Sequence, residues 1–192
     1  RDGSYHYGHY RPEATGRMRS SSFLLGGSGF VSFKLGGGMH QDLCYLSFVL
    51  EGENGSKEVA RFANSKYWNF QFPYVENGMR LLNMNLYVAD LSLYLGQTLH
   101  IEVVDLDASS DELSALTLDS IQTYYEKKPE FYAENYFQAK NSIPLEEYVD
   151  SPYQVLNGGF ETGDLTGWEF SSEGEAPGEV LEASLWWGKH AY

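Results

Sequence analysis

The chain has 192 residues, a formal net charge of −14 and an aromatic content of 16%. The length allows one domain, or one domain and a fragment, and the aromatic content supplies a sizeable core, which excludes an intrinsically disordered chain. The negative charge repels phosphate backbones and anionic headgroups, which argues against binding to nucleic acid or an acidic membrane surface. No apolar run approaches the roughly 18 residues of a membrane span, whereas neutral glycans and divalent cations remain allowed partners.

The first two thirds of the sequence predict a series of short strands separated by glycine-rich turns. Residues 30–35 have a strand-like alternation of side chains and lie between two glycine clusters. The apolar run at 45–50 has the length of a strand. Further strands are expected at residues 58–62, 86–88, 99–104 and 116–125. Short strands at this spacing predict an antiparallel β-sandwich or barrel.

Residues 126–156 differ from this pattern. Pro129 suits the first turn of a helix, and the aromatic residues after it are spaced as on one side of a short amphipathic helix. We therefore expect a linker with short helical turns over residues 126–156, between a body at 1–125 and a last segment at 157–192. That segment returns to β character but is too short to bury a core alone, so it must pack on something.

Cys44 is the only cysteine and lies in an apolar run. This setting predicts a buried, inert thiol. A single cysteine supplies neither a disulfide framework nor a cysteine-based metal site.

Four stretches together resemble a known family. They are residues 17–23 (RMRSSSF), 25–38 (LGGSGFVSFKLGGG), 85–96 (NLYVADLSLYLG) and 100–105 (HIEVVD). As a set they resemble the fructan-binding modules appended to bacterial levanases, the carbohydrate-binding modules of family 66. The resemblance implies a jelly-roll β-sandwich without catalytic activity, secreted or attached to a cell surface, which holds a parent glycoside hydrolase on fructan (levan-type) or a related polysaccharide.

The last segment resembles the opening of a module of this same kind. Residues 157–168 (NGGFETGDLTGW) look like a common start of jelly-roll carbohydrate-binding modules, although they follow the body here. The order of the motifs predicts an excised piece of a larger protein that is out of phase with its domain. Residues 157–192 would then complete the sandwich within the chain, as a circular permutation, or in a strand-exchanged homo-oligomer or neighbouring repeat.

The resemblance also implies a structural calcium ion. Related jelly-roll modules place Ca²⁺ between the Glu of the opening motif and an Asp on the last strand, which correspond here to Glu161 and Asp119, with Asn157 nearby. Carboxylate and carbonyl oxygens are the ligands that Ca²⁺ prefers. The alternative is that these carboxylates are ordinary surface residues.

Sugar hydroxyls call for bidentate donors and acceptors, which Arg and Asp or Glu supply. Binding residues concentrate in loops on a rigid scaffold, and each candidate has the alternative of being a solvated loop charge. The candidates are His40 and Asp42 after the triple glycine, Arg61 and Asn64 after one strand, Arg80 in the loop before residues 83–85, and Asp105 and Asp107 at the end of the strand at 99–104.

The chain departs from the family pattern at residues 106–115, which contain neither Gly nor Trp where family members have both. This loop borders the predicted sugar site, so the identity of the polysaccharide ligand stays open. A rival hypothesis is a structural spacer repeat of a cell-surface adhesin, without glycan binding. A glycosidase is not favoured, because no pair of carboxylates stands at identifiable positions.

Overall fold

The structure is a computed structural model. It describes residues 14–38, 40–53, 55–64, 75–76, 79–80, 85–109, 116–130, 151–160 and 162–172. The strands are β1 (Gly16–Ser20), β2 (Phe23–Leu24), β3 (Phe30–Gly37), β4 (Cys44–Leu50), β5 (Lys57–Phe62), β6 (Val75–Glu76), β7 (Met79–Arg80), β8 (Asn85–Asp90), β9 (Thr98–Asp105), β10 (Leu116–Gln122) and β11 (Trp168–Ser171). The described residues add one turn of 3-10 helix, η2 (Ser92–Tyr94). None of their helical segments is long and apolar enough to cross a lipid bilayer.

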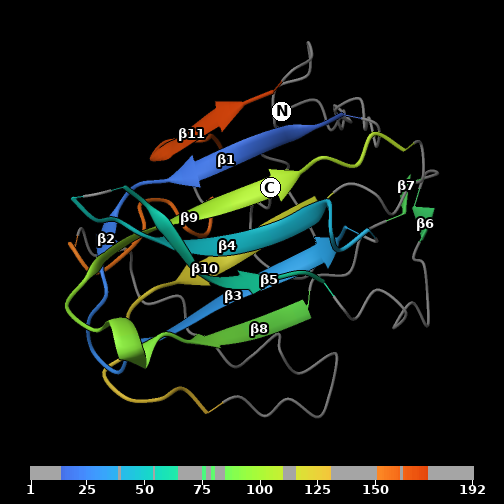
Figure 1. Ribbon diagram of the computed structural model, residues 1–192. Coiled ribbons are helices and arrows are strands. Elements are labelled where there is room, and N and C mark those ends of the chain that lie inside the picture. The colour runs from blue at the N-terminus through green and yellow to red at the C-terminus, as the bar shows by residue number, and fades with distance from the viewer. Residues whose placement is uncertain are drawn as a thin grey trace.

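The strands form two antiparallel sheets. The larger sheet has the order β11-β1-β9-β4-β5, with β2 also paired to β9, and the smaller has the order β10-β3-β8. Figure 1 shows the larger sheet in front of the smaller one, with the separate β6–β7 hairpin to one side. This architecture confirms the predicted all-β, antiparallel fold.

The strand pattern follows from alternation of side chains. In β4, Cys44, Leu46 and Phe48 are fully buried, while Tyr45 between them lies on the opposite side of the sheet and is half-buried. Successive residues of a strand point to opposite faces, so an apolar residue at every second position gives the strand one core face. The strands expected at 30–35, 45–50, 58–62 and 99–104 are all present, each within two residues of the predicted bounds.

The core lies between the two sheets and is rich in aromatic rings. Phe33 of β3 contacts Phe48 of β4 and Phe62 of β5, with ring centroids 5.8 Å and 5.3 Å away, and stacks on Tyr87 of β8 at 5.8 Å. These contacts join side chains of both sheets across one interior, as in a sandwich.

The C-terminal part of the described chain belongs to the same core. β11 pairs with β1 along four residue pairs, from Arg17 opposite Ser171 to Ser20 opposite Trp168, and Figure 1 shows these strands side by side. Val155, Phe160 and Trp168 are buried in the central cluster. In this structure residues 157–160 and 162–172 of the last segment therefore pack on the body of their own chain.

The predicted linker has two different parts in the structure. Residues 126–130 follow β10 without helix, and 131–150 lie outside the described residues. Residues 151–156 pack on the sandwich, because Thr123 Oγ1 donates to the Tyr153 carbonyl (2.8 Å) and the Val155 amide donates to Thr123 Oγ1 (3.1 Å). Residues 151–156 are thus part of the sandwich rather than a spacer.

Candidate functional site

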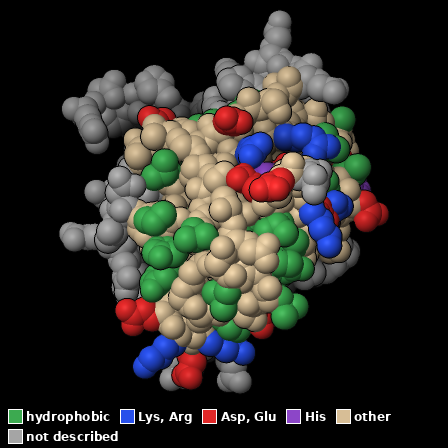
Figure 2. All heavy atoms as spheres, turned by 60° about the vertical axis from the view of Figure 1, so that its left-hand side comes forward, with side chains coloured by type: hydrophobic (Ala, Val, Ile, Leu, Met, Phe, Trp, Pro, Cys, Tyr) green, Lys and Arg blue, Asp and Glu red, His purple; other side chains and the backbone are tan. Residues whose placement is uncertain are grey.

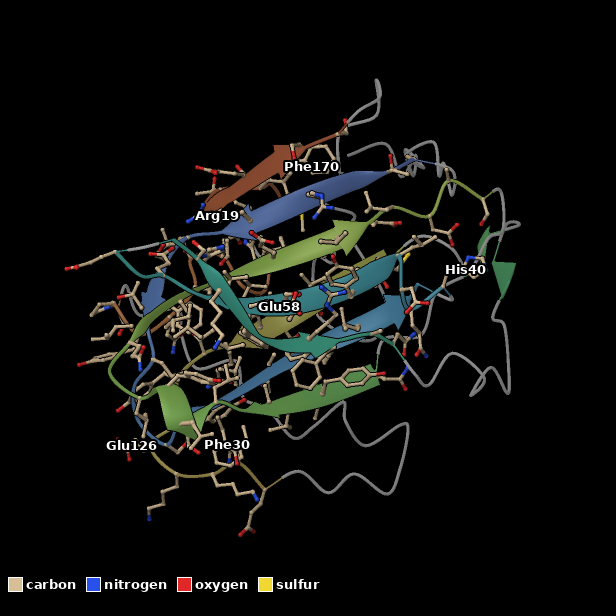
Figure 3. The ribbon with its side chains drawn as sticks, in the orientation of Figure 1. Arg19, Phe30, His40, Glu58, Glu126 and Phe170 are labelled. Carbon is tan, nitrogen blue, oxygen red and sulfur yellow. The ribbon has the colours of Figure 1, made fainter. Side chains whose placement is uncertain are left out.

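One end of the larger sheet collects most of the side chains that the sequence predicts as sugar ligands. Because β4 runs antiparallel to β5 and β9, its start lies beside their ends, with Cys44 opposite Asp105 and Ser47 opposite Arg61. Figure 3 shows His40 at this end. The predicted residues found here are His40 and Asp42 before β4, Arg61 and Asn64 at the end of β5, and Asp105 and Asp107 at the end of β9.

The carboxylate of Asp105 is bound within the protein. Its Oδ1 accepts hydrogen bonds from Cys44 Sγ (3.3 Å) and the Asp107 amide (3.2 Å), and its Oδ2 accepts one from the Leu116 amide (3.0 Å). Burial raises the pKa of this carboxyl, and the hydrogen bonds only partly offset the rise. Asp105 therefore ties the end of β9 to the starts of β4 and β10.

Cys44 is buried, as predicted. Burial, followed by the negative charge of Asp105 and the hydrogen bond to it, raises the pKa of the Cys44 thiol. The thiol consequently stays protonated and unreactive at neutral pH.

Asp107 holds His40 at the rim of this end. Its carboxylate is almost completely buried and accepts hydrogen bonds from His40 Nδ1 at 2.5 Å and from the Ser109 amide at 3.0 Å. Burial alone raises the pKa of Asp107, but these hydrogen bonds outweigh it and leave the pKa below its usual value. The His40 side chain is 48% exposed, and its Nε2 remains available to a ligand.

Asn64 lies beneath the surface instead of facing solvent. It is fully buried, its Nδ2 donates to the Gly37 carbonyl at 2.9 Å, and its Oδ1 accepts from Tyr87 Oη at 2.8 Å. These bonds connect the end of β5 to β3 and β8, so the polar atoms of Asn64 serve the fold.

Arg61 differs from these buried residues because it is held in place at the surface. Glu58 binds it as a fork, with Nε to Oε1 at 3.0 Å and Nη2 to Oε2 at 2.8 Å. The guanidinium carbon lies 3.8 Å from the centroid of the Tyr45 ring, and Ser47 Oγ donates to Glu58 Oε2 at 2.8 Å. We call Tyr45, Ser47, Glu58 and Arg61 the Arg61 platform; the Glu58 label in Figure 3 marks its position on the sheet.

The platform combines charges of both signs. The hydrogen bonds from Arg61, and after them the one from Ser47, lower the pKa of Glu58 despite its partial burial. The bonds to Glu58 raise the pKa of Arg61, and the negative charge of Asp42 adds to this rise. Asp42 is exposed, so this edge of the platform offers a carboxylate close to a fixed guanidinium.

Arg80 belongs to β7, whose side chains lie outside the described residues. In Figure 1 the β6–β7 hairpin lies on the side of the molecule where β5 and β9 end. Its assignment as a sugar ligand therefore stays a prediction.

Sequence reasoning missed three members of the platform. Tyr45, Ser47 and Glu58 lie within strands β4 and β5, whereas sugar ligands were expected in loops. The signal was present in the alternation, because the positions between the buried Cys44, Leu46 and Phe48 must face away from the core.

The residues expected to bind calcium are only partly described. Asp119 is buried and lies opposite Lys34 in the register of β10 and β3. Burial lowers the pKa of the Lys34 ammonium, and the negative charge of Asp119 opposes this change. The Asn157 side chain is engaged by its own turn, with Nδ2 donating to the Asp164 carbonyl at 2.9 Å and Oδ1 accepting from the Thr162 amide at 3.3 Å. Glu161 lies outside the described residues.

Within the ranges that the structure describes, no three His, Cys, Asp or Glu side chains gather as metal ligands. These residues alone do not fit a calcium cage, since Asp119 has a cationic neighbour and Asn157 is already bonded. Calcium at this place depends on Glu161 and stays a prediction.

Comparisons with known proteins do not extend the resemblance. Scans against family models, curated proteins and solved structures give no significant match to this chain. The likeness to fructan-binding modules therefore rests on the motifs in the sequence, and the functional argument rests on the Arg61 platform.

Proposed function

We propose that this chain is a non-catalytic carbohydrate-binding module of a secreted, multi-modular bacterial protein. It holds a parent glycoside hydrolase, or a cell surface, on fructan or a related polysaccharide. The motif resemblance supports this proposal from the sequence, together with the jelly-roll connection that the motifs imply.

The observation that carries the proposal is the fixed and exposed guanidinium of Arg61. Glu58 uses Nε and Nη2, so the second terminal nitrogen of Arg61 points away from Glu58 with its donors unspent by the described residues. A guanidinium that is already oriented loses little conformational freedom when it binds hydroxyl groups. The nearby carboxylate of Asp42 supplies acceptors, and a sugar hydroxyl both donates and accepts.

The charge of the surroundings favours a neutral ligand. The chain carries a net charge of −14, and Arg61 is already paired with Glu58. A uronic acid or sulfated glycan would approach a negative field with its nearest cation neutralised, which disfavours binding.

Isothermal titration of the intact chain with levan, inulin and a panel of neutral plant glycans tests the proposal. We expect binding to at least one of them, and a loss of about ten-fold or more in Arg61→Ala, because a lost hydrogen bond to a charged group costs roughly 1.5–3 kcal/mol. Arg61→Lys keeps the charge without the fork and should recover only part of the affinity.

Lys57→Ala is the matched control, because Lys57 is an exposed cation at the opposite end of β5. It should leave the affinity unchanged. If the folded chain bound none of these glycans with calcium present, the proposal would be wrong, and the rival hypothesis of an adhesin spacer would take its place.

A further inference from the structure

A row of polar side chains crosses five strands on the outer side of the larger sheet. The register places Glu169 of β11 opposite Arg19 of β1, Arg19 opposite Glu102 of β9, Glu102 opposite Ser47 of β4, and Ser47 opposite Arg61 of β5. We call these five residues the cross-strand row. With strands about 4.8 Å apart, the row spans roughly 19 Å.

The charged members of the row are exposed to solvent. The side chains of Arg19, Glu102 and Arg61 are 46%, 42% and 46% exposed. Ser47 is buried and forms part of the floor under Glu58. A ligand lying across the strands would therefore meet a series of exposed side-chain heads.

Arg19 and Glu102 each have a protein partner on one side. Arg19 donates through Nη2 to Glu51 Oε1 at 3.0 Å, and Glu102 Oε1 lies 3.4 Å from His100 Nε2. In the described part of the chain, nothing binds the remaining nitrogens of Arg19 or the second oxygen of Glu102. The other edges of both groups remain for a ligand.

His100 lies beside the carboxylates of Glu51 and Glu102. It is fully buried, and its Nδ1 lies 2.9 Å from Glu51 Oε1, the same oxygen that binds Arg19 and that accepts from Ser22 Oγ. The buried ring thus lies between Glu51 and Glu102, and Glu51 in turn binds Arg19. Figure 2 shows basic and acidic side chains gathered together on one face of the molecule.

A second row runs parallel to the first and adds apolar contact. Arg17 of β1, Val104 of β9 and Tyr45 of β4 lie opposite one another, each two residues along its strand from the member of the cross-strand row. Val104 is buried while Tyr45 is partly exposed. The two rows together present alternating donors and acceptors beside an aromatic ring, which is the surface chemistry that sugar rings bind.

The charges on this face nearly cancel. Arg17, Arg19 and Arg61 are offset by the carboxylates of Glu51, Glu58, Glu102 and Glu169. A surface with both signs and almost no net charge complements a polyhydroxyl ligand better than an anionic or a cationic one.

We propose that an internal stretch of a neutral, unbranched polysaccharide lies along the cross-strand row, perpendicular to the strands, with the Arg61 platform at one end. This inference rests on the proposed function and deepens it. It changes the mode of recognition from one sugar at the end of the sheet to several consecutive sugars across it.

The test is titration calorimetry with size-fractionated oligosaccharides of levan, inulin, xylan and cellulose, from disaccharide upward. We expect affinity to rise with chain length until the row is filled and then to level off. Arg19→Ala should lower the affinity for the longest oligosaccharides by about ten-fold, the size of one lost charged hydrogen bond, and leave disaccharide binding unchanged.

Two further variants separate the possible outcomes. Glu102→Gln keeps the size of the side chain but removes its charge, and should lower long-chain affinity by less than Arg19→Ala does. Lys57→Ala should have no effect at any length, and circular dichroism of each variant verifies folding.

Affinity that is independent of length, or unchanged by Arg19→Ala while Arg61→Ala still abolishes binding, would overturn the inference and leave the proposed function standing. Absence of binding to all four series would overturn both.

Discussion

The two sheets have polar outer faces that are used in opposite ways. On the larger sheet, Arg19, Glu102 and Arg61 stand half-exposed above the strands, and we call this side the open face. On the smaller sheet the outward positions Ser32, Lys34 and Asp119 are buried, and we call that side the covered face. The residue types alone do not separate these faces, since both mix charges and hydroxyls.

What separates them is how the polar atoms are satisfied. On the covered face, Ser32 shares a hydrogen bond with Tyr125 Oη at 2.5 Å, and Lys34 Nζ donates to Ser120 Oγ at 3.1 Å. Burial lowers the pKa of Lys34, and the charge of Asp119 opposes that change. A buried charge must be compensated internally, whereas an exposed one can keep part of its bonding capacity for a ligand.

The largest expected effect is on the covered face. Asp119→Ala removes a buried carboxylate that accepts a hydrogen bond from the Ser120 amide and lies opposite Lys34 in the strand register, and the loss of a buried hydrogen bond to a charged group costs roughly 1.5–3 kcal/mol of unfolding free energy. Equilibrium unfolding in urea measures this loss. Asp42→Ala, an exposed carboxylate, should change stability by less than about 0.5 kcal/mol.

The double variant Lys34→Met/Asp119→Ala removes both charges and should recover much of the lost stability. A loss in Asp119→Ala no greater than in Asp42→Ala would show that the two faces do not differ in this way.

Calcium is the second way to sharpen the comparison, because Asp119 is also the expected metal ligand. If Glu161 completes a site, Ca²⁺ at one hundred times its dissociation constant should stabilise the fold by about 2.7 kcal/mol. Urea unfolding with Ca²⁺ and with a chelator measures the difference. Glu161→Gln should remove most of it, and equal stability in both buffers would show that Asp119 serves the fold without calcium.

A smaller effect is expected for removal of the ion pair on the open face. The Arg61 and Glu58 side chains are 46% and 41% exposed, and solvent screens such pairs, so Arg61→Ala should cost less than about 1 kcal/mol of stability. Thermal and urea unfolding of the same protein used for glycan titration checks this. A stability loss as large as that of Asp119→Ala would mean that Arg61 serves the fold rather than a ligand.

The smallest effect is the acid response of the open face. Hydrogen bonds, from Ser22 first for Glu51 and from Arg61 first for Glu58, lower the pKa of both carboxyls below the ordinary value of 4.5. The stabilisation is therefore complete above pH 4.5 and lost as the pH falls through the lowered values, because the unfolded chain takes up protons first. Glu58→Gln should differ from the unchanged protein in urea unfolding at pH 7 and converge with it at pH 3. A difference that persists at pH 3 would contradict this origin.

Much of the sheet structure was predictable, because the alternation of Leu99, Ile101 and Val103 with His100 and Glu102 shows which positions face the core. The positions of β1 and β11 were less accessible. β1 lies between β9 and β11, strands that are distant in sequence, and only long-range packing selects these partners.

The candidate site was predictable in part. The expectation that sugar ligands lie in or beside loops selected His40, Asp42 and Arg61, and the structure places all three at one end of the larger sheet. It also selected Asn64, Asp105 and Asp107, whose polar atoms are largely used inside the protein. A charged or amide residue after a strand looks the same in sequence whether it binds a ligand or the neighbouring backbone.

The sequence by itself determined the all-β class, the core face of the main strands and the burial of Cys44, because these follow from local alternation and apolar runs. Only the tertiary structure decided which polar side chains remain exposed. Burial of Lys34 and exposure of Arg61 depend on which elements cover each sheet, and the cross-strand row exists only because pairing brings β11, β1, β9, β4 and β5 into one register.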